Sequence, residues 1–208
     1  MIHIGIASAR IIVFTRYPEP GKTKTRLIPL LGARGAATLQ CKLTEQVVSV
    51  VKRFSRSRNV TMEIRYNGGS VDLMSQWLGD DLLYRKQLGG DLGARMYQAF
   101  QEAFAEGCAR VIVVGSDILG FSESILQDAL DCLAEHDLVL GPANDGGYYL
   151  LGLRASQPEL FREISWGSAE VLRETTELAS QLGLSLGFVK ALDDVDRPED
   201  IQKLNLYE

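Results

Sequence analysis

Four basic side chains crowd a short segment near the start of a chain that is acidic overall. Residues 15–27 include Arg16, Lys22, Lys24 and Arg26, whereas the whole chain has a formal net charge of −5. Lysine acts as a point charge and arginine as a fork that matches two oxygens, so this basic loop could hold a phosphate chain. A solvated surface loop is the alternative, because isolated surface charges contribute little to stability.

Aspartates at two places in the chain could bind a divalent cation. Asp117 directly follows the apolar run at 110–114, and Asp193, Asp194 and Asp196 lie near the C-terminus. Mg²⁺ commonly takes one or two protein carboxylates and completes its shell with substrate oxygens and water. Helix capping or a turn explains the same residues. We weight the two interpretations equally for Asp117, favour capping for Asp194 and favour metal binding for Asp196.

Two glycine-rich stretches could bring the backbone close to a ligand. The stretch at 144–147, Asn-Asp-Gly-Gly, is typical of a hairpin turn, which needs no further function. In a functional turn Asp145 would hold an acceptor hydroxyl or act as a base, and Gly146 would allow close approach. The stretch at 89–93, Gly-Gly-Asp-Leu-Gly, could similarly bring amides to a nucleotide base or ribose.

Composition excludes several classes of function. The chain has 208 residues, with 22 Lys and Arg against 27 Asp and Glu, which argues against a nucleic-acid or anionic-membrane partner. Two histidines make a histidine triad or a histidine-rich metal site improbable, and three scattered cysteines indicate neither a disulfide framework nor zinc. No apolar run approaches the ~20 residues of a membrane span. We therefore expect a cytoplasmic protein.

Strands and helices alternate along the chain. Periodicity predicts strands near 10–14, 60–66, 110–114, 138–140, 148–153 and 186–192. It predicts helices near 33–54, 91–106, 122–134 and 168–182, with a last helix opened by Pro198. This alternation predicts an α/β fold, a three-layer α/β/α sandwich around a mostly parallel, twisted sheet, formed as a single domain over 1–208. Ligands of such sheets bind beyond the carboxyl ends of the strands, so chemistry is expected in the loops after Phe14, Val114 and Leu140.

Taken together, the motifs resemble those of one bacterial family. Its members are uncharacterised proteins, provisionally described as glycosyltransferases, with the nucleotide-diphospho-sugar transferase (glycosyltransferase-A) fold. The resemblance spans about 10–204 and rests on the stretches 14–27, 90–96, 115–117, 145–153 and 194–196. More distantly, residues 24–27 and the Asp-x-Asp-x-Pro-Glu-Asp ending at 194–200 are similar to phospholactate and molybdenum-cofactor guanylyltransferases.

The resemblance implies a role for each segment. The basic side chains would lie along the nucleotide phosphates, Lys24 and Arg26 as catalytic groups beside Arg16 and Lys22. Asp117 and Asp196 would bind Mg²⁺ or Mn²⁺. The base and ribose of the nucleotide would contact Gly90, Asp91, Leu92 and Gly93. The second substrate would face Asp145 and Gly146.

Three positions depart from the usual pattern of the family. A proline usually stands two residues after the metal aspartate, where this chain has Leu119, and a threonine usually stands where it has Arg197. Two small hydroxyl residues usually follow the tryptophan, but Gly167 comes directly after Trp166 here. The first change affects the shape of the Asp117 loop, and the second removes a helix cap. Reduced or lost activity is therefore one expectation.

Three functions remain open. In nucleotidyl transfer, an acceptor phosphate attacks a nucleoside triphosphate; we favour it slightly, because four cations exceed what a diphosphate requires. In glycosyl transfer, the donor is a nucleotide sugar, and an acceptor hydroxyl needs a base such as Asp145 if configuration inverts. The third is a nucleotide-binding module without catalysis. A small-molecule acceptor is the expected partner, and a homodimer is one option.

Overall fold

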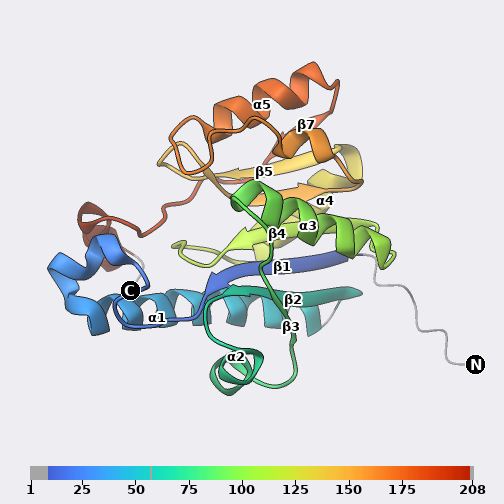
Figure 1. The fold of residues 1–208 in the computed structure, drawn as a ribbon. Coiled ribbons are helices and arrows are strands. Elements are labelled where there is room, and N and C mark those ends of the chain that lie inside the picture. The colour runs from blue at the N-terminus through green and yellow to red at the C-terminus, as the bar shows by residue number, and fades with distance from the viewer. Residues whose placement is uncertain (1–8, 57, 207–208) are drawn as a thin grey trace, which may run out of the picture.

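A seven-stranded sheet forms the centre of the molecule (Figure 1). The computed structural model describes residues 9–56 and 58–206. The strands are β1 (Ala9–Arg16), β2 (Val60–Asn67), β3 (Leu83–Lys86), β4 (Arg110–Gly115), β5 (Leu138–Pro142), β6 (Tyr148–Leu153) and β7 (Leu186–Phe188). Their order is β3-β2-β1-β4-β6-β5-β7, and every pairing is parallel except the two made by β6.

Helices cover both faces of this sheet. They are α1 (Ile28–Arg56), α2 (Val71–Leu78), α3 (Leu92–Ala105), α4 (Glu123–Glu135) and α5 (Val171–Gln181). Short 3₁₀ turns span η1 (Thr25–Leu27), η2 (Pro158–Phe161) and η3 (Pro198–Leu206). One buried cluster joins the sheet to α1 and α4, and a second joins it to α3 and α5. The predicted three-layer, mostly parallel α/β/α sandwich is confirmed.

The central strands are apolar on both faces because both faces are covered. In β1, Ile11 and Val13 belong to the cluster beneath α1, whereas Ile12 and Phe14 belong to the cluster beneath α3. A continuous apolar run of this kind is what a doubly covered parallel strand requires. The short apolar run at the start of the chain therefore becomes the middle of the sheet, and its carboxyl end delivers the basic loop.

The sequence patterns missed two edge elements. Helix α2 has only eight residues and is capped by Ser70, whose hydroxyl accepts a hydrogen bond from the Leu73 amide at 3.2 Å. Strand β3 has four residues, lies at the edge of the sheet and lacks apolar alternation. Neither element is long enough for periodicity to detect.

Three other boundaries also differ from the expectation. Helix α1 starts earlier than predicted but is broken at Gly32, where φ is 69°, so the predicted helix matches the part after the break. The last predicted strand ends at Phe188, and the last helix is the 3₁₀ turn η3.

Among the described helices, none has the length and apolar character that crossing a membrane would require.

Candidate active site

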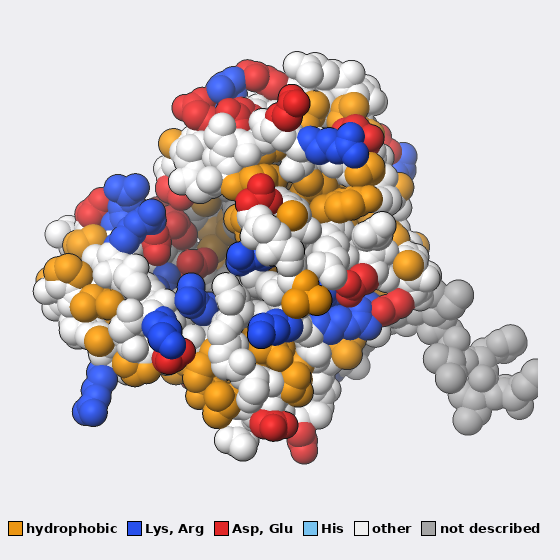
Figure 2. Space-filling model, viewed as in Figure 1, with side chains coloured by type: hydrophobic (Ala, Val, Ile, Leu, Met, Phe, Trp, Pro, Cys, Tyr) orange, Lys and Arg blue, Asp and Glu red, His pale blue; other side chains and the backbone are white. Residues whose placement is uncertain are grey.

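A cavity of about 660 Å³ opens at the carboxyl ends of β1 and β4. This volume lies within the usual range of small-molecule sites. Figure 2 shows the hollow, with acidic and basic side chains around its mouth and a hydrophobic floor. Its position agrees with the general rule that open α/β sheets bind ligands beyond their strand ends.

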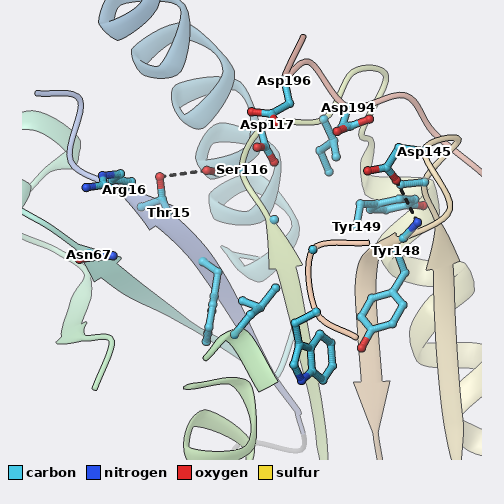
Figure 3. A pocket seen from close by; sticks show the side chains of 18 of the residues that line it. Thr15, Arg16, Asn67, Ser116, Asp117, Asp145, Tyr148, Tyr149, Asp194 and Asp196 are labelled. Carbon is cyan, nitrogen blue, oxygen red and sulfur yellow. Dashed lines mark hydrogen bonds between the residues drawn. The ribbon is translucent and has the colours of Figure 1, made fainter. Parts of the chain in front are cut away.

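The acidic segment at 193–196 crosses the ends of β4 and β5 and is tied to them by the backbone. The Val195 amide donates to the carbonyl oxygen of Asp117 at 2.9 Å, and the Leu192 amide donates to that of Pro142 at 3.0 Å. Carboxylates far apart in the sequence are thereby collected on one side of the cavity (Figure 3). They are Asp117, Asp145, Asp194 and Asp196.

The basic loop faces the same cavity, as the sequence predicted. Lys24 adopts a left-handed conformation, with φ 45°, and its side chain is only 3% exposed. Its ammonium donates to the carbonyl oxygen of Val195 and lies 3.4 Å from the Asp117 carboxylate. Lys24 therefore joins the loop after β4 to the C-terminal segment.

The remaining cations of the loop differ in how far they are neutralised. Arg26 forms an ion pair with Asp196, and Lys22 forms one with Glu19 at 2.8 Å. Arg16 also lines the cavity and makes no ion pair with any residue that the structure describes. Because Lys24 is held as well, Arg16 is the cation of this loop that is freest to meet a ligand.

Asp194 has a different place from the one favoured by the sequence. Its carboxylate lines the cavity and caps no helix in the described part of the chain, so the preference for capping was wrong. Burial raises its pKa to about 6, and the charges of Asp145 and Asp117 add to the rise. The capping role belongs to Asp200, whose carboxylate accepts the amide of Arg197 at 2.8 Å.

The donors fit a hard divalent cation that also binds the substrate. Asp117 and Asp196 supply the carboxylate oxygens that Mg²⁺ and Mn²⁺ prefer. In the described ranges, no three acidic, histidine or cysteine side chains form a group that could hold a metal. A cation at Asp117 and Asp196 would therefore complete its shell with substrate oxygens and water.

A buried polar network lies beneath the charged groups and was not predicted. The Thr15 hydroxyl hydrogen-bonds the hydroxyls of Ser116, at 2.9 Å, and of Thr44, at 3.0 Å. The Gln40 amide donates to Thr44 at 3.0 Å and to Ser116 at 3.2 Å. The network joins β1, α1 and the start of the Asp117 loop. The sequence signal for this network was a pair of polar residues, Gln40 and Thr44, four positions apart on the apolar face of α1.

The glycine-rich stretch before α3 lies at the cavity only in part. Leu92 lines the cavity, whereas Gly90, Asp91 and Gly93 do not. The Asp91 carboxylate caps α3 by accepting the amide of Ala94 at 2.8 Å, and the Gly90 carbonyl accepts from an arginine one turn later. A nucleotide contact at these three residues stays a prediction.

The turn between β5 and β6 holds Asp145 toward the cavity. Its carboxylate accepts the Gly147 amide at 2.9 Å, which fixes the side chain (Figure 3). Gly146 has φ 93° and is packed so closely that a Cβ would lie 2.2 Å from the Ala169 oxygen. Gly146 is not among the cavity-lining residues, and its close packing alone accounts for the glycine.

A family described as uncharacterized proteins conserved in bacteria (DUF2064) matches residues 50–168, more than half of the chain. The chain belongs to this family. A comparison with curated proteins found no match.

Solved structures are similar over nearly the whole DUF2064 chain. A protein of Desulfovibrio desulfuricans G20, provisionally described as a nucleotide-diphospho-sugar transferase, is 37% identical, with a TM-score of 0.86 over 95% of this chain and 86% of that one. Glucosyl-3-phosphoglycerate synthase of Mycobacterium tuberculosis is 11% identical, with a TM-score of 0.61 over 95% and 75%. The inositol-1-phosphate CTP transferase of T. maritima is 15% identical, with a TM-score of 0.57 over 94% and 92%. The two distant proteins share the fold.

The departures of this DUF2064 chain from the usual pattern have local compensations. The Leu119 amide donates to the Asp193 carbonyl at 2.8 Å, a bond that a proline could not make. At Arg197 no side-chain cap is restored, but the Asp200 carboxylate accepts the Asp196 and Arg197 amides and so holds the start of η3. Gly167 has φ 83°, a conformation that suits glycine better than a hydroxyl residue. The altered positions therefore do not disrupt the cavity.

Proposed function

We propose that the chain is a metal-dependent glycosyltransferase that uses a nucleotide-diphospho-sugar donor. The observation that carries this proposal is the hydrogen bond from the Lys24 ammonium to the Val195 carbonyl, which holds the acidic segment against the basic loop. The 37% identical relative, itself provisionally described as such a transferase, supports the assignment.

The pairing of the charges favours a diphosphate donor over a triphosphate. Four cations of the basic loop face four carboxylates in the cavity, so their formal charges cancel. Lys24 and Arg26 already pair with two of those carboxylates, and Lys22 pairs with Glu19. The excess of cations that favoured nucleotidyl transfer in the sequence therefore disappears. A donor with fewer phosphates and one divalent cation suits this balance better.

Each side chain has a role in this proposal. Arg16 and Lys22 bind the diphosphate, and Asp117 and Asp196 hold Mg²⁺ or Mn²⁺. The bound metal would neutralise charge on the departing nucleoside diphosphate. In an inverting transfer the acceptor oxygen bonds to the anomeric carbon, the bond from that carbon to the diphosphate breaks, and Asp145 takes the hydroxyl proton. Lys24 acts as a positioning residue, because its ammonium touches both Asp117 and Val195.

Nucleotidyl transfer is the second candidate. The observation in its favour is the presence of four basic side chains at one cavity, all of which could face a triphosphate if their ion pairs opened on binding. In that reaction an acceptor phosphate oxygen attacks the α-phosphorus, and pyrophosphate leaves.

Product analysis separates the candidates. Purified protein with Mn²⁺ is incubated with a panel of acceptors and either nucleotide sugars or nucleoside triphosphates. Glycosyl transfer releases a nucleoside diphosphate, whereas nucleotidyl transfer releases pyrophosphate. A thermal-shift panel of the same nucleotides, with and without metal, selects the donor beforehand, because a tight ligand raises the melting temperature by mass action.

One outcome would count against catalysis, and another against the role of Asp117. Nucleotide stabilisation that is equal with and without Mn²⁺, together with no turnover in any arm, is expected of a binding module. Turnover that Asp117→Asn leaves unchanged would remove Asp117 from the site. The matched control is Asp128→Asn, which alters an exposed carboxylate on α4.

A further inference from the structure

One part of the cavity lies on the α3 side of the sheet and is lined by apolar side chains. Two come from β1 and β6, two from the first turns of α3, and two are aromatic residues in and after β6. We call this part the apolar chamber. Its side chains are Phe14, Leu92, Met96, Tyr148, Leu151 and Trp166.

Trp166 forms a wall of the chamber that is fixed before any ligand binds. A Cβ on Gly93 would lie 2.3 Å from the indole nitrogen, so the glycine allows the ring to rest against the backbone of α3. The Tyr148 ring meets the indole edge-on, with centroids 6.4 Å apart. The neighbouring Ser165 amide donates to the Glu174 carboxylate at 2.7 Å. A preorganised aromatic wall reduces the entropy lost on binding.

The chamber offers little to a polar ligand. The Tyr148 hydroxyl is buried beside Thr175, so only the Tyr148 ring is available to a ligand. The Leu92 side chain, by contrast, is 44% exposed. Covering it with an apolar ligand would be favourable, because burial of apolar surface lowers the free energy. A sugar or a nucleobase edge enclosed here would lose hydrogen bonds to water, and apart from the buried Tyr148 hydroxyl the indole N–H of Trp166 is the one polar group among these six side chains.

Polar partners lie elsewhere in the cavity, around the end of β1. Gln87 donates both amide hydrogens, to the carbonyls of Thr15 at 3.1 Å and Arg65 at 2.9 Å, which leaves its oxygen as an acceptor. Asn67 and Arg16 lie on the same side of the cavity (Figure 3). These groups suit the polar edge of a nucleotide, so the chamber is left for the other substrate.

We propose that the apolar chamber binds an aliphatic or aromatic group of the acceptor. The identification of this ligand as the acceptor rests on the proposed function, whereas the existence of an apolar site does not. Both the chamber and the metal carboxylates line the same cavity. An acceptor that reaches both is therefore a molecule with an apolar end and a reactive end.

Tryptophan fluorescence tests the chamber directly. The chain has two tryptophans, so Trp77→Phe leaves Trp166 as the sole reporter. Methyl, hexyl, heptyl and octyl β-glucosides are titrated below their micellar concentrations. Saturable changes should appear with the longer chains and tighten about fourfold for each added methylene. Absence of saturation, or equal binding of the methyl and octyl probes, would overturn the proposal.

Two leucines provide a matched pair of variants. Leu92 is 44% exposed and lines the chamber, whereas Leu88 is 54% exposed and does not line the cavity. Leu92→Ser should weaken octyl glucoside about fivefold, because part of the leucine surface no longer covers the alkyl chain. Leu88→Ser should leave the affinity unchanged. Equal effects of the two variants would mean non-specific adsorption and would overturn the site.

A nucleotide arm distinguishes the acceptor from the nucleobase. The titration is repeated with Mn²⁺ and a saturating concentration of whichever of UDP, GDP, CDP, ADP and dTDP most raises the melting temperature. If the affinity for octyl glucoside stays within twofold of its value without nucleotide, the assignment of the chamber to the acceptor is supported. Competition would place the base in the chamber and overturn the assignment. If no nucleotide binds, the proposed function fails and the acceptor assignment with it, while the alkyl titration still reports on the apolar site.

Discussion

Two groups of charged side chains on this molecule use the same residue types for different ends. One lies between α3 and the edge of the sheet, and we call it the buried ion cluster. It consists of Arg10, Glu63, Arg65, Arg85, Glu102 and Glu106. The other is the set of charges at the cavity. The first group satisfies its own charges, and the second leaves some of them for a ligand.

The buried ion cluster is closed by contacts within the protein. Glu63 is fully buried and is contacted by Arg10 at 3.2 Å and by Arg65. Arg85 joins the same group through Glu106 at 2.6 Å. Three positive and three negative side chains balance, so no external ion is required.

The cavity has as many positive as negative side chains, but not all of them form ion pairs. Asp194 makes no ion pair, and neither does Arg16, within the described residues. Both line the cavity. The comparison suggests that the count of charges in a cluster is less informative than the list of those without partners.

The largest expected effect is a loss of stability in the buried ion cluster, compared with an exposed ion pair elsewhere on the surface. Glu63→Ala should lower the free energy of unfolding by about 4 kcal/mol, because it leaves buried arginines without their shared carboxylate. Urea unfolding followed by circular dichroism measures the change. Glu177→Ala, which removes one of the two exposed partners of Arg173 on α5, should cost less than about 1 kcal/mol. A similar loss in both variants would mean that burial does not distinguish the two sites.

The second prediction concerns turnover. Asp117→Asn should reduce the transfer rate by about 100-fold, the scale on which removal of one electrostatic contact affects a transition state. Its stability should hardly change, because the Asp117 side chain is 42% exposed. Rate assays and urea unfolding on the same preparation provide both values. A large loss of stability with little loss of rate would make this carboxylate structural, like those of the buried ion cluster.

Sequence patterns were sufficient for the fold and for one side of the cavity. Long apolar strands and amphipathic helices determine the central layers. The cations at 16–26 are conspicuous because the chain is acidic overall, and Asp117, Asp194 and Asp196 are conspicuous because they follow a strand or lie close together in the sequence. Polar residues at the chain's buried positions were harder to interpret. Glu63 and Arg65 alternate with apolar residues in β2, as an exposed strand face would, yet α3 covers them.

The partners of individual carboxylates could not be predicted, since they depend on contacts distant in the sequence. Asp194 and Asp196 are two residues apart, but one faces other carboxylates and the other faces Arg26. Which of them meets a cation depends on how the C-terminal segment crosses the ends of β4 and β5. The apolar chamber could not be predicted either, because Tyr148 and Leu151 belong to an apolar strand whose pattern does not distinguish a cavity wall from the core.

The third prediction tests whether the cavity also contains a structural charge. Lys24→Met keeps most of the side-chain volume but removes the ammonium that donates to the Val195 carbonyl. An acceptor left without its donor should cost about 1–2 kcal/mol in the free energy of unfolding. The metal concentration needed for half-maximal rate should rise, because Asp117 loses its positioning contact. Arg26→Met, at a pair in which the arginine is 63% exposed, should cost much less stability. Equal stability losses would contradict the distinction.

The smallest expected effect is a pH dependence that originates in the buried ion cluster. Burial alone would raise the pKa of Glu106, but hydrogen bonds from Arg10 and Arg85 outweigh it and lower the pKa below that of an ordinary glutamate. A depressed pKa contributes stability above the unfolded-state value, near 4.5, and that stability is lost as the pH falls through the folded-state value. Glu106→Gln should therefore reduce the decline in unfolding free energy between about pH 5 and pH 3 by roughly 0.5 kcal/mol, a figure discounted because the side chain is 39% exposed. Glu177→Gln serves as the exposed control. If the unfolding free energy fell more steeply with decreasing pH in Glu106→Gln than in the parent protein, the pKa of Glu106 would not be lowered by folding, and the prediction would be wrong.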